Sequence, residues 1–261
     1  MTNAVKRHWP EYLMEAGGLG LFMISASGFA IVLFHPAAPG AVLGPLLRRA
    51  LMGLAMGLTA ISLIYSPWGQ QSGAHFNPAV TLTFLRLGRV APWDAAFYVG
   101  AQFIGGVAGL AVAVAAAGSL VGAPSVNYVA TLPGPRGMSV AFLAELAIAF
   151  VMMPMILVTT ARLPRLASFT GLLAGALVAV SITLEAPLSG MSLNPARSFA
   201  SAMLAQLWTG FWIYLTAPLL GMLLAAEVHQ RSSAPAVPCA KLHHANDRRC
   251  IFRCRYVRNP S

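Results

Sequence analysis

Six long apolar runs are the feature of this sequence that most limits its fold. The hydrocarbon core of a bilayer is about 30 Å thick, and a helix crosses it with about 20 residues. Runs of that length lie at about residues 11–34, 46–67, 92–117, 138–160, 167–188 and 208–230. Charged residues make up 9% of the chain, whereas a soluble domain carries about 25%. The chain is therefore predicted to be an all-α membrane protein with six transmembrane helices.

A large soluble helical bundle is the alternative for a chain with 57% hydrophobic residues. Its helices would need polar faces that repeat every 3.6 residues. The stretch GLAVAVAAAGSLVG, residues 109–122, has no such face. The mean hydropathy of +0.70 agrees with the membrane interpretation, which we therefore prefer.

Lys and Arg residues indicate how the chain is oriented. With six spans both termini lie on one side, together with thirteen of the seventeen basic residues: Lys6, Arg7, Arg86, Arg89, Arg162, Arg165 and seven from Arg231 to Arg258. Cytoplasmic loops carry an excess of Lys and Arg, so both termini, including residues 1–9, are expected in the cytoplasm and the chain in the cell membrane. No folded basic domain carries the net charge of +10, so we expect no nucleic-acid partner.

The two halves of the chain repeat one another. Glu15 lies in the first span and Glu145 in the fourth, and Tyr98 and Gly105 recur at the same separation as Tyr214 and Gly221. Each unit has three spans, an odd number, so the second copy must enter the membrane from the opposite face. The sequence thus predicts an inverted repeat, with units at about 10–117 and 138–230.

The triplet Asn-Pro-Ala interrupts the apolar pattern once in each unit. The residues are Asn77, Pro78 and Ala79 in GAHFNPAVT, and Asn194, Pro195 and Ala196 in MSLNPARSF. Asn is a favoured N-cap and Pro is preferred at the first helical position, so each triplet is predicted to start a helix. A helix from 77 to 87 would be about 16 Å long, half a bilayer. We therefore expect two re-entrant half-helices that meet N-terminus to N-terminus and line a cavity, because irregular backbone at that depth is otherwise not tolerated.

These features resemble the aquaporin family, also called the major intrinsic proteins. The resemblance rests on GAHFNPAVT, LNPARSF, the six spans, the Glu in spans one and four and the Gly-rich AQFIGGVAG, and it covers residues 10–230. It implies a homotetrameric passive channel for water, with glycerol, urea, hydrogen peroxide, ammonia and metalloid acids as further candidate solutes. Protons and ions would be excluded, and transport would need no cofactor.

The resemblance also assigns roles to the residues of the two motifs. Each half-helix N-terminus aims roughly half a positive charge at the pore centre, and Asn77 and Asn194 would donate hydrogen bonds to a passing solute. Arg197 is a charge at membrane depth, which is functional by default; the alternative is that it reaches the lipid interface. Glu15 and Glu145 are expected to accept hydrogen bonds from the backbone of the re-entrant loops.

In the aquaporin family, four residues form a second constriction of the pore. We assign these residues in this chain by counting from the two motifs. They are Met56, Ile182, Met191 and Arg197. This set lacks both the His that is usual in water-selective members and the aromatic residues of glycerol facilitators. The sequence therefore leaves the choice of solute open.

A proton-coupled secondary transporter that uses Glu15 and Glu145 is the alternative function. Neither carboxylate has a basic partner within its span, and the half-helix fields would oppose a proton at the midplane. No nucleophile–base arrangement or phosphate loop is present, so we do not expect an enzyme.

The C-terminal tail, residues 231–261, falls outside the resemblance. It is basic and holds all three cysteines of the chain. Cys239 and His243 are four residues apart, as are Cys250 and Cys254, and on helical turns these four side chains would form the Cys₃His tetrahedron that zinc favours. The alternative is a reduced tail that lies on anionic lipid headgroups.

Overall fold

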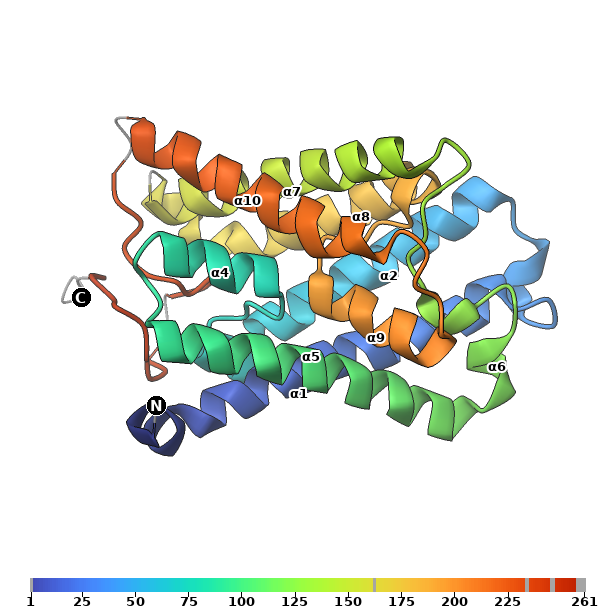
Figure 1. Cartoon of the computed structure of the whole chain (residues 1–261), viewed down its shortest axis with the longest axis horizontal. Helices are drawn as coiled ribbons and strands as arrows, with labels where there is room; N and C mark the ends of the chain where they lie inside the picture. The colour runs from blue at the N-terminus through green and yellow to red at the C-terminus, as the bar shows by residue number, and fades with distance from the viewer. Residues whose placement is uncertain (1, 162, 233–234, 245–246, 257–261) are drawn as a thin grey trace.

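Six long helices of the computed structural model (Figure 1) cross most of its length. The structure describes residues 2–161, 163–232, 235–244 and 247–256. Within them, six helices are long and apolar enough to span a membrane. They are α1 (Thr2–Phe34), α2 (Pro45–Tyr65), α5 (Pro92–Ala117), α7 (Met138–Ala161), α8 (Thr170–Ser189) and α10 (Phe211–Arg231). The predicted all-α membrane fold is confirmed.

Helix α1 is the element that differs most from its predicted span. It begins at Thr2, not near residue 11, and continues through Pro10. The apolar run marks the part of a helix that crosses hydrocarbon, and a polar first turn can extend beyond it into the aqueous region. Arg162 and Arg258, which contribute to the predicted charge asymmetry, lie outside the described residues.

Two half-helices lie between the long helices, as the Asn-Pro-Ala triplets predict. Helix α4 (Pro78–Arg86) and helix α9 (Pro195–Ala205) start from the centre of the molecule and run to opposite ends (Figure 1). Each packs on the last long helix of the other repeat, α4 on α10 and α9 on α5. The two repeats are therefore interlocked through their half-helices.

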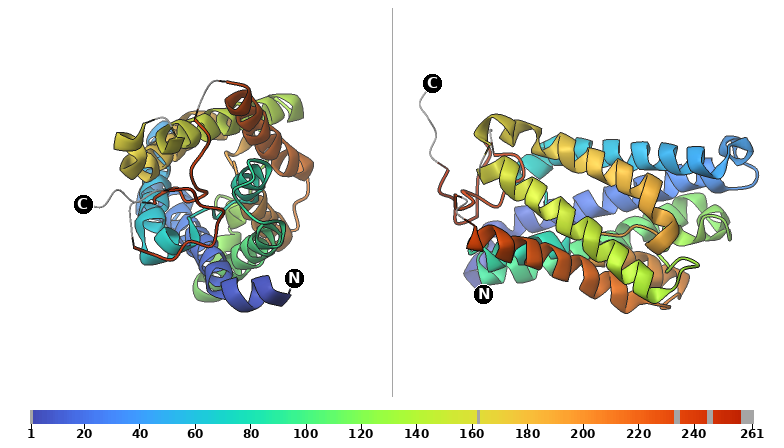
Figure 2. Two further views of the ribbon diagram at one scale, coloured as in Figure 1. Left: turned by 90° about the vertical axis from the view of Figure 1, so that its left-hand side faces the viewer. Right: turned by 90° about the horizontal axis from the view of Figure 1, so that it is seen from above.

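Short helices connect these elements. They are η1 (Pro39–Val42), α3 (Pro67–Ser72), α6 (Ser119–Gly122), η2 (Asn127–Val129) and η3 (Pro164–Phe169). Seen end-on in Figure 2, the long helices form a ring, and the C-terminal chain crosses its centre. Both termini lie at one end of the molecule, which we call the tail end, and we call the other the far end.

Small residues bring the long helices into close contact. The most extensive pairs are α1 with α5, α2 with α8, and α7 with α10. A Cβ atom on Gly105 of α5 would come within 2.1 Å of the carbonyl oxygen of Ala16 in α1, and one on Gly57 of α2 within 2.6 Å of that of Gly175 in α8. Such close approach of backbones is how helices associate without a hydrophobic driving force in a membrane.

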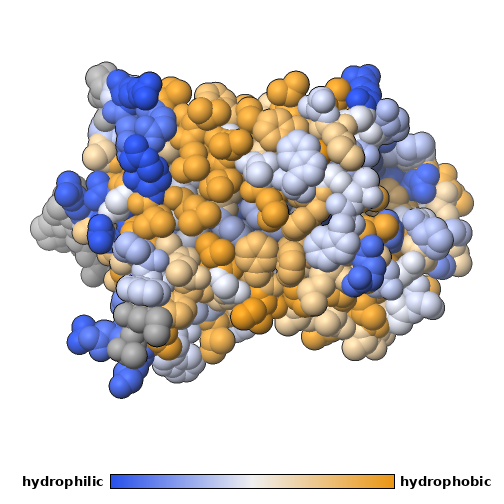
Figure 3. All heavy atoms as spheres, in the orientation of Figure 1, coloured by the Kyte–Doolittle hydropathy of each residue, from blue (hydrophilic) through white to orange (hydrophobic). Residues whose placement is uncertain are grey.

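The surface has the distribution that a bilayer requires. Figure 3 shows apolar side chains gathered over the middle of the molecule, with hydrophilic ones at the two ends. Large apolar side chains of the membrane-spanning helices, such as Leu58, Ile104 and Leu184, are more than half exposed. These faces are positioned to contact lipid.

Candidate functional site

A cavity of about 350 Å³ runs between the helices from one end of the molecule toward the other. At the far end it is lined by Phe34 and Arg49, and at the tail end by His75 and Leu242. Between them it passes the two asparagines of the triplets, Asn77 and Asn194. The predicted cavity is thus present at the meeting point of the half-helices.

Each asparagine caps its own half-helix. Asn77 has an extended backbone, and its Oδ1 accepts a hydrogen bond from the N–H of Ala79, at 2.9 Å. Asn194 does the same for Ala196 at 3.1 Å and for Arg197 at 3.3 Å. Since the oxygen is occupied by the helix N-terminus, the amide nitrogen faces away from it.

The amide nitrogens then tie the two half-helices together. Nδ2 of Asn77 donates to the carbonyl of Leu193, and Nδ2 of Asn194 donates to the carbonyl of Phe76, each at 2.7 Å. A primary amide carries two N–H donors, so each asparagine keeps one further donor. Both residues line the cavity, where this donor is available to a solute oxygen.

The loops that precede the half-helices share an unusual backbone. Gly73, Ala74 and Phe76 have positive φ in the first loop, and Gly190, Met191 and Leu193 have positive φ in the second, each 117 residues later. Left-handed conformations are costly for residues other than Gly and need support from their surroundings. The two loops are therefore held in one irregular conformation by tertiary contacts.

Two buried carboxylates provide that support. Glu15 accepts hydrogen bonds from the N–H groups of His75 and Phe76, at 3.1 and 2.6 Å. Glu145 accepts from those of Ser192 and Leu193, at 2.6 and 2.8 Å. The carboxylates thus satisfy backbone donors that would otherwise be unpaired inside the membrane. A serine hydroxyl donates to each as well, Ser72 to Glu15 and Ser189 to Glu145, both at 2.7 Å.

Two partners in this network were not predicted from the sequence. Gln102 of α5 donates to Glu15 at 2.8 Å and to Thr81 at 3.1 Å. Glu185 of α8 is buried and accepts from the Ser189 hydroxyl that also reaches Glu145. Both lie within largely apolar helices, and polar or charged groups at such positions are candidates for a role by default, which is the signal that could have found them.

Arg197 follows the second triplet and lines the cavity. Its Nη1 is buried and has no hydrogen-bond partner within the described part of the chain. A buried guanidinium donor without a protein partner is costly, unless water or solute in the cavity pairs with it. This position argues against the alternative that Arg197 reaches the lipid interface.

The other three residues of the predicted constriction line the same cavity. Met56 of α2, Ile182 of α8 and Met191 of the second loop are its apolar members. Ile182 packs against both the core cluster that contains Met56 and the one that contains Met191. The structure therefore places all four residues on the wall of one cavity, with Ile182 packed between the clusters of Met56 and Met191.

His75 lies at the tail-end part of the cavity and is buried. Its Nδ1 is 3.0 Å from Oγ1 of Thr81, and its Nε2 is 2.8 Å from the carbonyl oxygen of Ala240. Both ring nitrogens are therefore engaged in ordering the loop and the tail. Ala240 and Leu242 belong to the tail. The family resemblance does not include the tail, so it did not predict that the tail would reach the cavity.

The tail contains a cluster of possible metal ligands, with one difference from the prediction. Cys239, His244, Cys250 and Cys254 have ligand atoms within 4.8 Å of one another. His243, the predicted ligand, instead has its ring 5.0 Å from that of Tyr65. The prediction assumed helical turns, whereas residues 235–244 and 247–256 contain no helix, so a four-residue spacing no longer places two side chains on one face.

The thiols of the cluster are close enough to interact with one another. Sγ of Cys239 and Sγ of Cys250 are 3.5 Å apart, and Sγ of Cys254 is 3.1 Å from Nε2 of His244. The hydrogen bond from Cys239 lowers the pKa of Cys250 below its ordinary value, and the same bond, with burial, raises the pKa of Cys239. A low thiol pKa favours the thiolate form that binds metals.

The comparisons with known proteins agree with this geometry. The family model described as major intrinsic protein matches residues 3–229. The chain belongs to the major intrinsic protein family. Its fold is similar to that of a solved aquaglyceroporin from Plasmodium falciparum, with a TM-score of 0.71, 20% identity and coverage of 86% of this chain and 96% of that one.

Curated relatives come from plants and bacteria. Aquaporin NIP1-3 of Oryza sativa subsp. japonica is 35% identical over 210 residues, which are 80% of this chain and 69% of the relative. Glycerol uptake facilitator protein-like 6 of Lactiplantibacillus plantarum is 39% identical over 223 residues, 83% of this chain and 94% of the relative. Members of the family are channels, so the chain is a passive membrane channel for water and small solutes and not an enzyme. The transporter alternative has no support.

Proposed function

We propose that this channel conducts water together with neutral solutes of about the size of glycerol, while excluding protons and cations. The observation that carries the proposal is the composition of the cavity wall, where Met56, Ile182 and Met191 share one cavity with Arg197. Such a wall offers an apolar side and a single strong donor. A molecule with a hydrocarbon side and hydroxyl groups matches both.

Exclusion of cations follows from the charges at the centre of the pore. The N-termini of α4 and α9 meet at Asn77 and Asn194, and each contributes roughly half a positive charge. The Arg197 guanidinium adds a full charge toward the far end. A cation therefore meets a positive potential, whereas a neutral hydrogen-bonding solute does not and exchanges its partners along the pore.

Closure by the methionines is the competing possibility at this constriction. Met side chains are flexible and unbranched, and Met56 and Met191 are only 1% and 6% exposed, so they could fill the gap beside Ile182. The channel would then pass water alone. The solute experiment below separates the two outcomes.

The test is solute flux into liposomes that contain the purified full-length protein. Stopped-flow light scattering under sucrose, glycerol and urea gradients gives the permeability for each solute relative to water. We expect water and glycerol permeability well above that of protein-free liposomes, without a requirement for a proton gradient. Water flux without glycerol or urea flux would leave a strict water channel, and flux that depends on a proton gradient would support a transporter.

We also propose that both termini are cytoplasmic, that the protein resides in the cell membrane, and that it forms homotetramers. Arg86 ends α4, Arg89 follows that helix and Arg165 lies in η3, all at the tail end, and excess basic residues mark the cytoplasmic side. Four-fold assembly is the form that the family resemblance implies. Accessibility of Cys254 to a membrane-impermeant thiol reagent tests the orientation in sealed cells, and light scattering in detergent tests the mass of the assembly.

A last proposal concerns the tail cluster, for which transport itself has no need. Three thiol sulfurs and one imidazole nitrogen within 4.8 Å match the donor set that binds a zinc-like ion. Metal analysis of protein purified without a polyhistidine tag tests the site. We expect about one equivalent per chain after exposure to zinc.

A further inference from the structure

The C-terminal tail folds back across the tail-end mouth of the cavity. The N–H of Leu242 donates to the carbonyl of Gly73 at 3.1 Å, and the carbonyl of Ala240 is 2.8 Å from Nε2 of His75. Gly73 and His75 belong to the first re-entrant loop, so the tail is bonded directly to the pore wall. The end-on view of Figure 2 shows the tail crossing the middle of the helix ring.

One apolar side chain of the tail lines this mouth, and a second packs on its wall. Leu242 is 4% exposed and is part of the cavity lining itself. Phe252 is 7% exposed, and its ring is stacked on that of His75 with 5.3 Å between centroids. The Leu242 side chain therefore offers an apolar wall, without a hydrogen-bond partner, to a solute that leaves the pore at this end, and Phe252 holds His75 from the side of the tail.

Regular secondary structure does not hold the tail in this position. The described residues 235–244 and 247–256 form no helix or strand, and few backbone hydrogen bonds link them to the body of the protein. Arg253 donates its N–H to the carbonyl of Arg89 at 2.9 Å, and Nε of Arg249 is 3.6 Å from Glu11. Ordering such a segment is costly in conformational entropy, so a cross-link within it would decide whether it stays docked.

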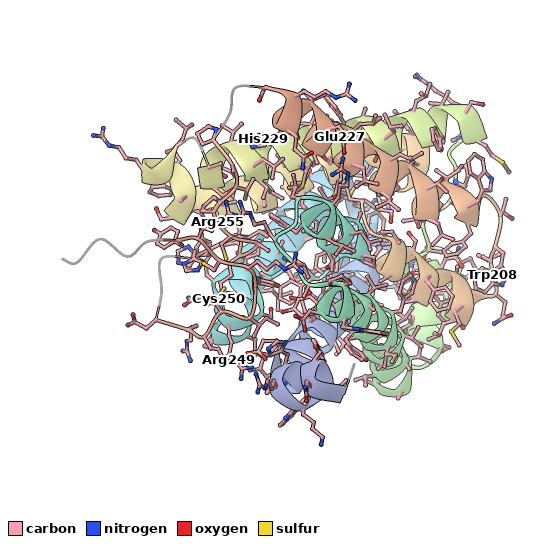
Figure 4. The ribbon with its side chains drawn as sticks, turned by 60° about the vertical axis from the view of Figure 1, so that its left-hand side comes forward. Trp208, Glu227, His229, Arg249, Cys250 and Arg255 are labelled. Atoms are coloured by element: carbon pink, nitrogen blue, oxygen red, sulfur yellow. The ribbon has the colours of Figure 1, made fainter. Side chains whose placement is uncertain are left out.

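The Cys/His cluster is placed where such a cross-link would act. Cys239 and His244 precede and follow Leu242 in the chain, and Cys250 and Cys254 precede and follow Phe252. An ion bound by all four would therefore fix at once Leu242, which lines the mouth, and Phe252, which packs on His75. Figure 4 shows Cys250 at the tail end near Arg249 and Arg255, far from Trp208 at the other end.

The surroundings of the cluster suit a thiolate-rich metal site. Ligand atoms around tetrahedral zinc lie about 3.8 Å apart, and the four atoms here lie within 4.8 Å of one another. Three thiolates and one divalent ion leave a net negative charge. Lys241, which is 2% exposed, and Arg89 both interact favourably with the cysteines, and Nζ of Lys241 also donates to the carbonyl of Arg249 at 2.8 Å.

We propose that a zinc-type ion bound by Cys239, His244, Cys250 and Cys254 locks the tail over the tail-end mouth and closes the channel, so that the metal acts as an inhibitory ligand. This inference rests on the proposed channel function. It adds a closed state that depends on metal, and it locates the closure at Leu242 and Phe252. Loss of the metal frees the tail from its cross-link and opens the mouth.

The experiment compares water flux in liposomes with and without zinc. The full-length protein, without a polyhistidine tag and with its thiols kept reduced, is reconstituted after chelator treatment and then exposed to buffered zinc. We expect water permeability to fall by on the order of tenfold on zinc addition and to recover with chelator. Metal analysis and hydrogen exchange of residues 73–77 follow binding and docking independently of flux.

Neighbouring histidines supply a matched pair of variants. His244→Asn removes a ligand and is expected to weaken zinc binding at least about tenfold, with loss of inhibition at the same zinc concentration. His243→Asn changes the adjacent residue outside the cluster and is expected to respond as the parent does. Leu242→Ser is expected to bind one equivalent of zinc while conducting water in its presence.

The possible results separate this inference from the proposed function. Flux in the metal-free protein that zinc does not change, despite one equivalent bound, would overturn the closure and leave the channel. If zinc inhibits water flux equally in His244→Asn and in the parent, zinc acts at another site. That result would overturn the assignment to the Cys/His cluster. If a thiol oxidant abolishes water flux in the absence of zinc, a Cys239–Cys250 disulfide holds the tail in place. That result would overturn the proposal that a metal closes the channel. Absence of flux in every form would contradict the proposed function as well.

Discussion

The side-chain nitrogen of Asn77 lies 2.7 Å from the carbonyl oxygen of Leu193, and the equivalent pair, Asn194 and Phe76, is joined at the same distance. Each half-helix is therefore tied to the loop that starts the other. The arrangement fixes two positive helix ends against each other, although they repel. It follows that the positive potential at the pore centre is a permanent feature of the folded protein.

Arg197 is predicted to strengthen this barrier against cations. Replacing it with Val removes a full positive charge from the cavity wall, so we expect proton and cation leak to increase by on the order of tenfold or more. Water flux should persist. Leak is measured with a pH-sensitive dye inside the same liposomes, and an unchanged leak in a folded, water-conducting variant would contradict the role.

Glu145 is predicted to be needed for stability of the second re-entrant loop. In Glu145→Gln an amide N–H₂ group replaces an oxygen that accepts from Ser192 or Leu193, which leaves buried donors facing each other. An unsatisfied buried group costs about 1–3 kcal/mol, so the apparent melting temperature in detergent should fall by several degrees.

Glu227→Gln is the control for that substitution. Glu227 pairs with Arg86 at 2.7 Å, but the two side chains are 33% and 52% exposed. Exposed ion pairs contribute about 0–1 kcal/mol, so this variant should melt close to the parent. Equal melting temperatures for the two variants would show that Glu145 does not hold the loop.

Gly105 is predicted to be irreplaceable at the contact of α1 with α5. In Gly105→Ala the new methyl group would meet the carbonyl of Ala16 at 2.1 Å, which forces the helices apart. Gly100 lies in the same helix, and a methyl group added there would meet no atom within 4 Å, while Ala is favoured over Gly by about 1 kcal/mol in helix propensity. We expect Gly105→Ala to lower the yield and melting temperature of the purified protein, and Gly100→Ala to preserve both.

Local signals explain why much of this fold is readable from the sequence. Apolar runs of membrane length locate the long helices, and the capping preferences of Asn and Pro locate the starts of α4 and α9 at Pro78 and Pro195. The duplicated pattern supplies the inverted arrangement. Each of these patterns can be read directly along the chain, so no knowledge of packing is needed.

Contacts between distant segments could not be predicted in the same way. Gln102 reaches Glu15 across 87 positions, and Ala240 reaches His75 across 165. The prediction named His243 as the histidine of the cluster, whereas the structure has His244 there, and this difference has a related cause. Two adjacent residues of an irregular segment point in directions that are set by tertiary contacts, here the ring of Tyr65 against His243, and not by a helical period.

Ile182 is predicted to determine which solutes pass. It lines the cavity with Arg197, and its side chain can neither donate nor accept a hydrogen bond. Ile182→His would narrow the constriction and place a polar partner opposite Arg197. We therefore expect the ratio of glycerol to water permeability to fall by on the order of tenfold, because water gains a partner while the larger solute loses space.

Stopped-flow measurement of water, glycerol and urea flux on parent and variant decides this prediction. Val178→Thr is a suitable control, because Val178 also lines the cavity but lies one helical turn away from Ile182 in α8. Its effect on the ratio should be small. If the parent passes neither glycerol nor urea and the His variant leaves the ratios unchanged, Ile182 does not select solutes, and Met56 and Met191 close the constriction to a hole of the size of water.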